Sequence, residues 1–170
     1  MRAFDAILKR RSIRKYKTDI PVTDDQIEII LNSAMAAPTA KNAQEWEFLV
    51  VRERESLNKI METHPFAKML ETAPCVIIVC ANLEKEAIPG YWIGDCGAAM
   101  QNILLSATAL GLGSVWLGLQ AVPERVDAIR KIFNLPANIM PFGIAVLGTA
   151  DETKEENDRY DAKKVHFEKW

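Results

Sequence analysis

The sequence predicts an α+β domain in which a mixed β-sheet is covered by helices. Apolar runs typical of strands alternate with helical stretches of unequal length along the 170 residues, which favours a layered α+β structure. The run Val76-Ile-Ile-Val79 is apolar at every position, so it predicts a strand buried on both faces, at the centre of the sheet. With 49% hydrophobic and 26% charged residues and no linker, residues 1–170 are predicted to form one domain.

The first half of the chain predicts helices and one strand ahead of the central strand. Residues 4–8 place three apolar side chains at helical spacing. A second helix opens at the capping box Thr23-Asp-Asp-Gln26 and ends at Pro38. Residues 48–51 form a strand-like apolar run, and residues 57–72 show helical spacing with a break at the proline within them.

The second half predicts a long helix over residues 92–110, a strand over 114–119, a helix from Pro123 and a strand over 142–147. Small residues near the start of the long helix allow close approach of another backbone, either from a second subunit or from the same chain: Gly94, Gly97, Ala98 and Ala99.

The last twenty residues, 151–170, differ from the rest in composition. They are highly charged and contain few aliphatic side chains, yet they end in Phe167 and Trp170. Aromatic side chains gain free energy when they are buried, so this segment is predicted to be a C-terminal tail that docks on another surface.

Charge and cysteine usage exclude several classes of function. The net charge of −2 disfavours a nucleic-acid-binding protein, which needs a broad basic surface. No apolar run is long enough for a signal peptide or a membrane span, so we expect a cytoplasmic protein with no membrane partner. Cys75 and Cys80 fall on opposite faces of the central strand and Cys96 stands alone, so neither a disulfide nor a metal site is expected.

The stretch RRSIRKY, residues 10–16, is the first of three polar clusters that could bind a ligand. In an extended conformation, Arg10, Ser12 and Arg14 point to one side and Arg11 to the other. Two guanidinium groups and a hydroxyl group can hold a phosphate through charge-assisted hydrogen bonds. The alternative is a solvated basic surface, which is the usual role of a charged run.

The other two clusters lie in loops beside predicted strands. PTAKNAQEW, residues 38–46, carries several polar side chains between a helix end and a strand, where its Asn can bind a ligand or close a turn. GLGSVWLG, residues 111–118, has glycines that permit close backbone approach or simply end the preceding helix. Its glycine spacing matches neither a dinucleotide fingerprint nor a P-loop.

The order and spacing of these clusters resemble the nitroreductase family of FMN-dependent oxidoreductases. The resemblance covers nearly the whole chain and also includes DCGAAMQNILLSATALGLGSVWLG in the middle and DRYDAKKVHFEKW at the end. It implies a compact member with a mainly antiparallel central sheet flanked by helices. It further implies a homodimer with FMN in the subunit interface and a tail, 151–170, that docks on the partner.

The resemblance also assigns roles to residues. Arg10, Arg11, Ser12, Arg14 and Arg159 are expected at the ribityl phosphate and the pyrimidine side of the flavin. The loop lent by the partner subunit would supply Pro38, Thr39, Ala40, Asn42 and Gln44, and Lys68 would meet the ring. Trp116, Leu117, Gly118 and Leu119 would pack on the isoalloxazine, with backbone N–H groups near Gly118 and Leu119 reaching N5 and O4. Two positions depart from the family pattern, with Pro65 where an Asn is common and Glu45 where a Pro is common.

The implied activity is hydride transfer from NADH or NADPH to flavin N5 and then, by a ping-pong mechanism, to a nitroaromatic, quinone or similar small-molecule acceptor. Because the flavin carries the chemistry, no catalytic acid or base is assigned, and Arg14 and Lys68 would stabilise the anionic reduced flavin by charge. His64 and His166 are expected to be structural or surface residues. The alternative function is a flavin-binding carrier or sensor without turnover.

Overall fold

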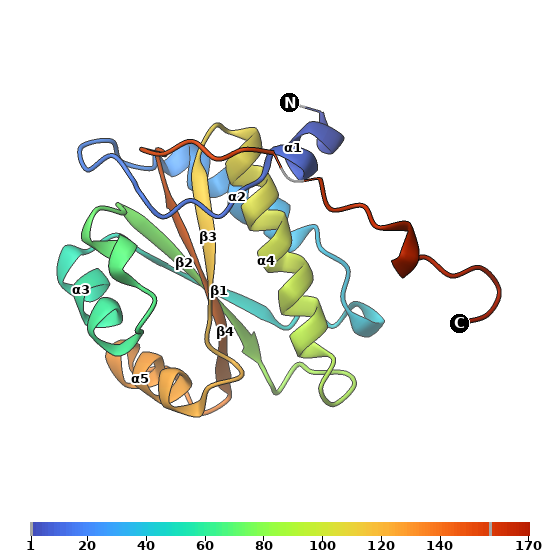
Figure 1. The fold of residues 1–170 in the computed structure, drawn as a ribbon. Helices are drawn as coiled ribbons and strands as arrows, with labels where there is room; N and C mark the ends of the chain where they lie inside the picture. Colours follow the sequence, from blue (N-terminus) through green and yellow to red (C-terminus); the bar gives the residue numbers. More distant parts are fainter. Residues whose placement is uncertain (1, 157) are drawn as a thin grey trace.

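The structure, a computed structural model that describes residues 2–156 and 158–170, is organised around a four-stranded antiparallel sheet (Figure 1). The strand order is β1-β2-β4-β3, with β1 at Trp46–Val51, β2 at Cys75–Asn82, β4 at Ile139–Gly148 and β3 at Gly113–Gly118. All three strand pairs are antiparallel. The described residues add one parallel bridge, between Ser12 and Ser114. The predicted α+β class with a mainly antiparallel sheet is confirmed.

The central position predicted for the Val76–Val79 run is also confirmed, because β2 pairs with β1 on one side and with β4 on the other. Its side chains alternate between two hydrophobic cores, one on each face of the sheet. Cys75 belongs to one core and Cys80 to the other, as the sequence spacing predicts. All three cysteines are free and buried.

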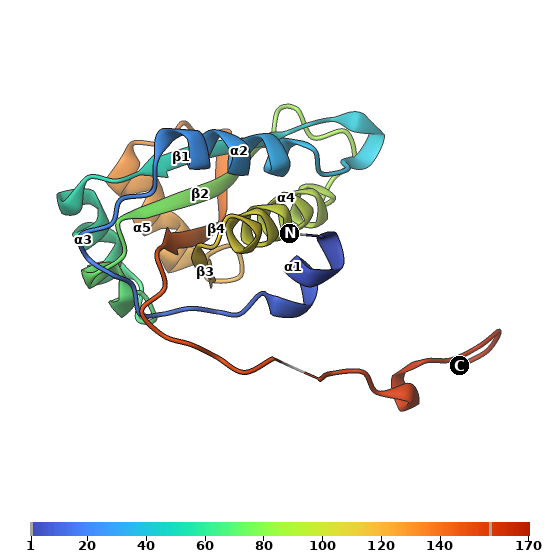
Figure 2. The same ribbon diagram turned by 90° about the horizontal axis from the view of Figure 1, so that it is seen from above.

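Helices cover both faces of the sheet, as Figure 2 shows with the sheet seen from above. One face packs against α2 (Asp24–Met35) and α4 (Trp92–Ala109), and the other against α3 (Arg54–Thr63) and α5 (Pro123–Phe133). The helical stretch predicted over 57–72 is two separate elements, α3 and a 3₁₀ helix at Lys68–Glu71. The interruption falls at Pro65, which lacks a backbone N–H and cannot continue a helix.

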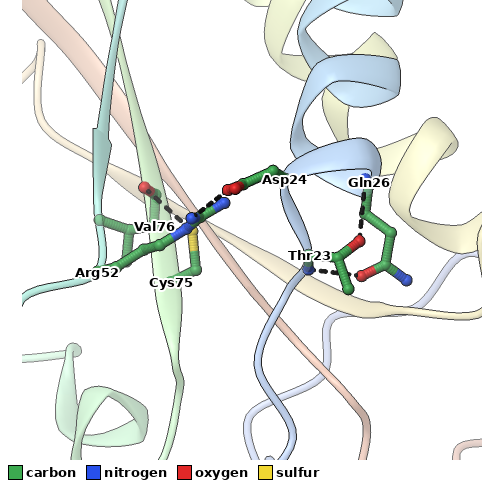
Figure 3. Close-up of polar contacts among 6 residues, drawn as sticks. All are labelled: Thr23, Asp24, Gln26, Arg52, Cys75 and Val76. Atoms are coloured by element: carbon green, nitrogen blue, oxygen red, sulfur yellow. Dashed lines mark hydrogen bonds and ion pairs between the residues drawn. The ribbon is translucent and has the colours of Figure 1, made fainter.

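The start of α2 is fixed by the predicted capping box (Figure 3). The Thr23 hydroxyl accepts a hydrogen bond from the N–H of Gln26 at 3.2 Å, and the Gln26 side chain accepts one from the N–H of Thr23 at 3.0 Å. An ion pair of 2.5 Å between Arg52 and Asp24 joins the first turn to the residue that follows β1. These contacts set the direction in which α2 runs toward the loop at Pro38.

The sequence left open whether the small residues of α4 pack against the same chain or against a second subunit, and these residues differ in this respect. Ala99 is fully buried within this chain, and a Cβ on Gly97 would lie 3.7 Å from the Phe142 ring. A Cβ on Gly94 would meet nothing within 4 Å. Packing within one chain therefore accounts for Gly97 and Ala99 and leaves Gly94 on an open surface.

The C-terminal segment begins on the body of its own chain and then leaves it. Asp151 donates its N–H to the carbonyl of Lys15 at 2.9 Å, and Lys154 Nζ donates to the carbonyl of Ser12 at 2.7 Å. Residues 160–170 extend away from the sheet and helices (Figures 1 and 2). Phe167 and Trp170 are 82% and 101% exposed, so the tail end is an aromatic surface without cover in a single chain.

Candidate ligand site at the edge of the sheet

The basic stretch at residues 10–17 is held as an extended segment along the free edge of β3. Ile13 donates its N–H to the carbonyl of Ser114 at 2.9 Å, and Lys17 donates to the carbonyl of Thr149 at 3.0 Å. Tyr16 is buried between these contacts, and its hydroxyl donates to the carbonyl of Ile13 at 2.6 Å. Apolar anchors on this segment therefore hold the intervening cations in place.

A cavity of about 550 Å³ brings together the cations predicted to bind an anion. The residues that line it are Arg10, Arg11, Ser12, Arg14, Lys154, Glu155 and Arg159. The extended conformation was expected to turn Arg11 away from the others. It lines the same cavity because the segment makes isolated bridges rather than a continuous ladder, so strict alternation is not imposed.

The charges in this cavity repel one another. Burial lowers the pKa of the Arg10 guanidinium, and the positive charges of Arg11 and Arg159 lower it further. The Arg11 guanidinium donates to the carbonyls of Glu155 at 2.6 Å and Leu8 at 2.8 Å, but its buried Nη2 has no partner among the described residues. A buried donor without a partner is costly, and an anion bound among the guanidinium groups of the cavity would relieve their repulsion.

A second cavity, of about 580 Å³, lies on the other side of Arg14. Its lining is Arg14, Lys15, Tyr16, Phe66, Lys68, Met69, Glu71, Thr72 and Asp151. Lys68 stands in the 3₁₀ helix after the Pro65 break and lines this cavity together with Arg14. Arg14 thus connects a cationic cavity with a more apolar one.

The end of β3 lines a third cavity of about 350 Å³, whose residues include Trp116, Gly118, Leu119, Arg125 and Phe142. Leu119 donates its N–H to the carbonyl of Phe142 at 3.3 Å, so this amide is already used inside the sheet. Along a strand of an antiparallel pair, the backbone N–H and C=O groups of successive residues point alternately toward and away from the partner strand. Leu119 points toward β4, so the backbone groups of Gly118 point to the free edge of β3. Of the two amides expected to meet a ligand, only that of Gly118 is so oriented. The Leu117 side chain is buried in the core.

His64 holds the Gly118 carbonyl, in the peptide group between Gly118 and Leu119, a role that the sequence did not indicate. Its Nε2 donates to the Gly118 carbonyl at 3.1 Å, and its Nδ1 accepts the N–H of Phe66 at 3.3 Å. Arg125 Nη1 donates to the same carbonyl at 3.2 Å. Burial lowers the pKa of His64, which keeps the ring neutral and suited to these two contacts. No sequence signal could place residue 64 beside residue 118.

The loop at residues 38–45 lies apart from this site within one chain. Figures 1 and 2 place it at the end of α2, away from residues 10–16. Lys41, Asn42 and Gln44 have φ angles of 51°, 58° and 51°, a conformation that costs non-glycine residues about 1 kcal/mol or more each. The structure therefore does not bring Pro38, Thr39, Ala40, Asn42 and Gln44 to the cations of the same chain, as a loop lent to a partner would require.

Glu45, at the end of this loop, has an unusual environment. Its side chain is fully buried, and neither carboxylate oxygen accepts a hydrogen bond from a donor group of the described residues. Burial raises the pKa of the Glu45 carboxyl, and the carboxyls of Asp95 and Glu86 raise it further. The sequence marked Glu45 as a departure from the family pattern, but gave no indication of its contact with Asp95.

No group of three or more His, Cys, Asp or Glu side chains that could hold a metal ion occurs in residues 2–156 and 158–170. Over the same residues, no helix has the length and apolar character needed to cross a membrane.

The fold and the site together define an α+β protein with an arginine-lined cavity beside an apolar one at the open edge of its sheet. The model of the Nitroreductase family matches residues 7–65 and 61–149. The chain belongs to the nitroreductase family, and the resemblance read from its motifs is confirmed.

Similar proteins match over almost the whole chain. A protein of Methanothermobacter thermautotrophicus, provisionally named an NADH dehydrogenase/NAD(P)H nitroreductase, is 45% identical over all of this chain and 88% of its own. An FMN-dependent nitroreductase from Clostridium difficile R20291 is 33% identical, with a TM-score of 0.90 over 98% of this chain and 99% of its own. A provisionally named nitroreductase from Desulfovibrio desulfuricans, solved in complex with FMN, is 28% identical, with a TM-score of 0.85 over 100% and 98%. Family and relatives together make this chain an oxidoreductase.

Proposed function

We propose that the protein is an FMN-dependent oxidoreductase that takes hydride from NADH or NADPH and reduces a nitroaromatic, quinone or similar acceptor. The observation that carries the proposal is the arginine-lined cavity, in which the mutual repulsion of the guanidinium groups favours a bound anion. The adjoining cavity beyond Arg14 offers space for the ring system attached to such a phosphate. Relatives named as FMN-dependent or solved with FMN support the choice of this cofactor.

The residues that would hold FMN fall into three groups. Arg10, Arg11, Ser12, Arg14 and Arg159 would bind its phosphate and its pyrimidine side. Lys68 and Arg14 both line the second cavity, where their charges would stabilise an anionic ring. The Gly118 N–H, next to the Gly118 carbonyl that accepts from His64 and Arg125, would donate to the ring edge.

The chemistry supplied by bound FMN would be hydride transfer, and the protein would supply position and charge. The surface around Trp116 must then admit nicotinamide and acceptor in turn, which gives ping-pong kinetics. We assign no acid or base, because the flavin would carry the chemistry and most charged side chains that line these cavities are Arg and Lys. Reduced nicotinamide as donor fits the cytoplasmic location that we propose.

We further propose that the active unit is a homodimer in which the partner's copy of loop 38–44 completes the flavin site. The separation of this loop from the cations of its own chain supports the arrangement. Apolar side chains left exposed in one chain also support it. Phe4, Ile7 and Leu8 on α1 (Ala3–Lys9) are 79%, 51% and 60% exposed.

Purified protein is expected to be yellow and to release FMN, not FAD, when denatured, because the arginine cavity offers one phosphate site. The released flavin is identified by chromatography against both standards. NAD(P)H oxidation with an added quinone or nitroaromatic then separates an enzyme from a flavin carrier or sensor. Protein that stays colourless after titration with FMN contradicts the proposal.

Substitution of Arg14 or Arg159 by Ala should weaken FMN binding by roughly 1.5–3 kcal/mol, or roughly 10- to 150-fold, the scale of a hydrogen bond to a charged group. The Arg14 backbone N–H donates to Glu152 at 2.5 Å, and this contact survives the substitution. Isothermal titration of the apoprotein with FMN measures the change. Lys131→Ala on α5 removes the same charge away from the cavity and is the matched control. Affinities equal to the control would show that both arginines are surface charges.

A further inference from the structure

Glu45 and Asp95 form a contact between two buried carboxyl groups, one at the end of loop 38–45 and one in the first turn of α4. The Asp95 side chain lies within hydrogen-bonding reach of the Glu45 carboxyl. Its Oδ2 also accepts the N–H of Ala40, in the middle of the loop, at 2.8 Å. Asp95 therefore joins the middle and the end of the loop to α4.

The loop depends on such contacts because its backbone is strained. Three of its non-glycine residues, Lys41, Asn42 and Gln44, have positive φ angles. The other side-chain contacts within it are between exposed residues, such as Gln44 N–H to Thr39 Oγ1 at 3.1 Å. The Asp95 carboxylate provides the buried attachment. Strained backbone of this kind persists only where the surroundings hold it.

The surroundings of the Glu45 carboxyl are acidic. The titratable groups that act on it are Asp95 and Cys96 on α4 and Glu86 in the loop before this helix. None of these groups can supply a positive charge. Two carboxyl groups in contact cannot both be ionised without a large cost, but they form a strong hydrogen bond when they share one proton.

We propose that Glu45 is a protonated positioning residue, whose neutral carboxyl donates a hydrogen bond to Asp95 and thereby holds loop 38–44 on the start of α4. A protonated Glu45 avoids the free-energy cost of a buried charge on its two carboxyl oxygens. Asp95 Oδ2 can still accept the hydrogen bond from the N–H of Ala40. When the proton is lost to solvent, two adjacent carboxylates repel and the loop is released. An effect of this release on flavin binding rests on the proposed function, but the proton shared by Glu45 and Asp95 does not.

The direction of the pH effect follows from linkage. Between the ordinary pKa of a Glu, about 4.3, and its raised value in the fold, the folded state keeps a proton that the unfolded state has lost. Stability must therefore fall as the pH rises through this window. A Gln side chain at position 45 donates the same hydrogen bond to Asp95 and does not titrate. The Glu45→Gln variant should therefore lack this pH-dependent part of the free energy of unfolding.

The test compares urea unfolding of the wild type and Glu45→Gln between about pH 5 and about pH 9, in protein stripped of ligand. The ratio of wild-type to variant unfolding constants should rise about tenfold for each unit by which the pKa of Glu45 is raised. Glu47→Gln is the matched control, because Glu47 lies two residues away in an exposed 2.9 Å ion pair with Lys85. A ratio that stays constant with pH for Glu45→Gln overturns the proposal.

A second measurement needs no stable variant. Carbon NMR of wild-type protein carrying ¹³C-carboxyl glutamate should show one resonance that titrates well above the others, and its absence overturns the proposal. With FMN present, the wild type should release flavin as the pH rises through the same window and Glu45→Gln should retain it. Protein that never binds flavin would contradict the proposed function, while the unfolding and NMR titrations would still decide the shared proton.

Discussion

Replacing Tyr16 with Ala should destabilise the protein by about 3–5 kcal/mol, the cost of removing a large aromatic side chain from a core. Tyr16 is 3% exposed and fills the space over Gly148, where an added Cβ would lie 2.9 Å from its ring. Its backbone bridges Ala150, and its hydroxyl donates to the Ile13 carbonyl at 2.6 Å. For a chain of this length, the loss should lower Tm by roughly 6–20 °C.

The effect should extend to the ligand site because Tyr16 anchors the segment that carries the arginines. Tyr16→Phe is the control, since it keeps the ring and removes only the hydroxyl bond, at a cost of about 1–2 kcal/mol. Urea unfolding followed by circular dichroism gives both values, and FMN titration below the unfolding midpoint gives the affinity. If Tyr16→Ala unfolds within 1 kcal/mol of Tyr16→Phe, residues 10–17 are not held as the structure indicates.

Elements whose signals are local could be predicted from the sequence. The capping box at Thr23 needs only residues within one turn, and the structure contains both of its hydrogen bonds. The apolar run at Val76–Val79 predicts its central position because a strand buried on both faces requires it. The final strand was expected at 142–147 and is longer, Ile139–Gly148, because pairing with β2 extends it through Pro141.

The candidate site shows the same division. The arginines of RRSIRKY are neighbours in sequence, so their clustering could be predicted. His64 with Gly118, and Glu45 with Asp95, are pairs separated by 54 and 50 residues, whose contact is set by the packing of distant elements. A pattern of residue types contains no information on such pairs. Pro65, next to His64, and Glu45 itself were recognised in the sequence only as departures from the family pattern. Neither residue indicated which distant residue would be in contact.

Truncation after Tyr160 should weaken the proposed dimer by roughly a thousandfold or more and lower flavin content with it. The removed residues include Val165, Phe167 and Trp170, which are 42%, 82% and 101% exposed in one chain. Burying each on a partner would contribute about 1.5–3 kcal/mol, so their loss exceeds 4 kcal/mol. Because residues 151–155 contact the segment 10–16 of the same chain, a cut after Tyr160 leaves the arginine cavity intact, Arg159 included.

The truncation thereby separates partner docking from phosphate binding. If the flavin site is completed by the partner's loop 38–44, a ligand that binds only the dimer stabilises it, and losing the dimer must weaken the ligand in equal measure. Arg159→Ala in the full-length chain should show the reverse pattern, with weakened FMN binding and an intact dimer at protein concentrations far above its dissociation constant.

Full-length Phe167→Ser/Trp170→Ser tests the apolar contribution without shortening the chain. Light scattering gives the mass and absorbance gives the flavin content. A truncated protein that remains dimeric and fully flavinated shows that the tail does not embrace the partner, and a monomeric wild type that retains FMN shows that the site is not shared.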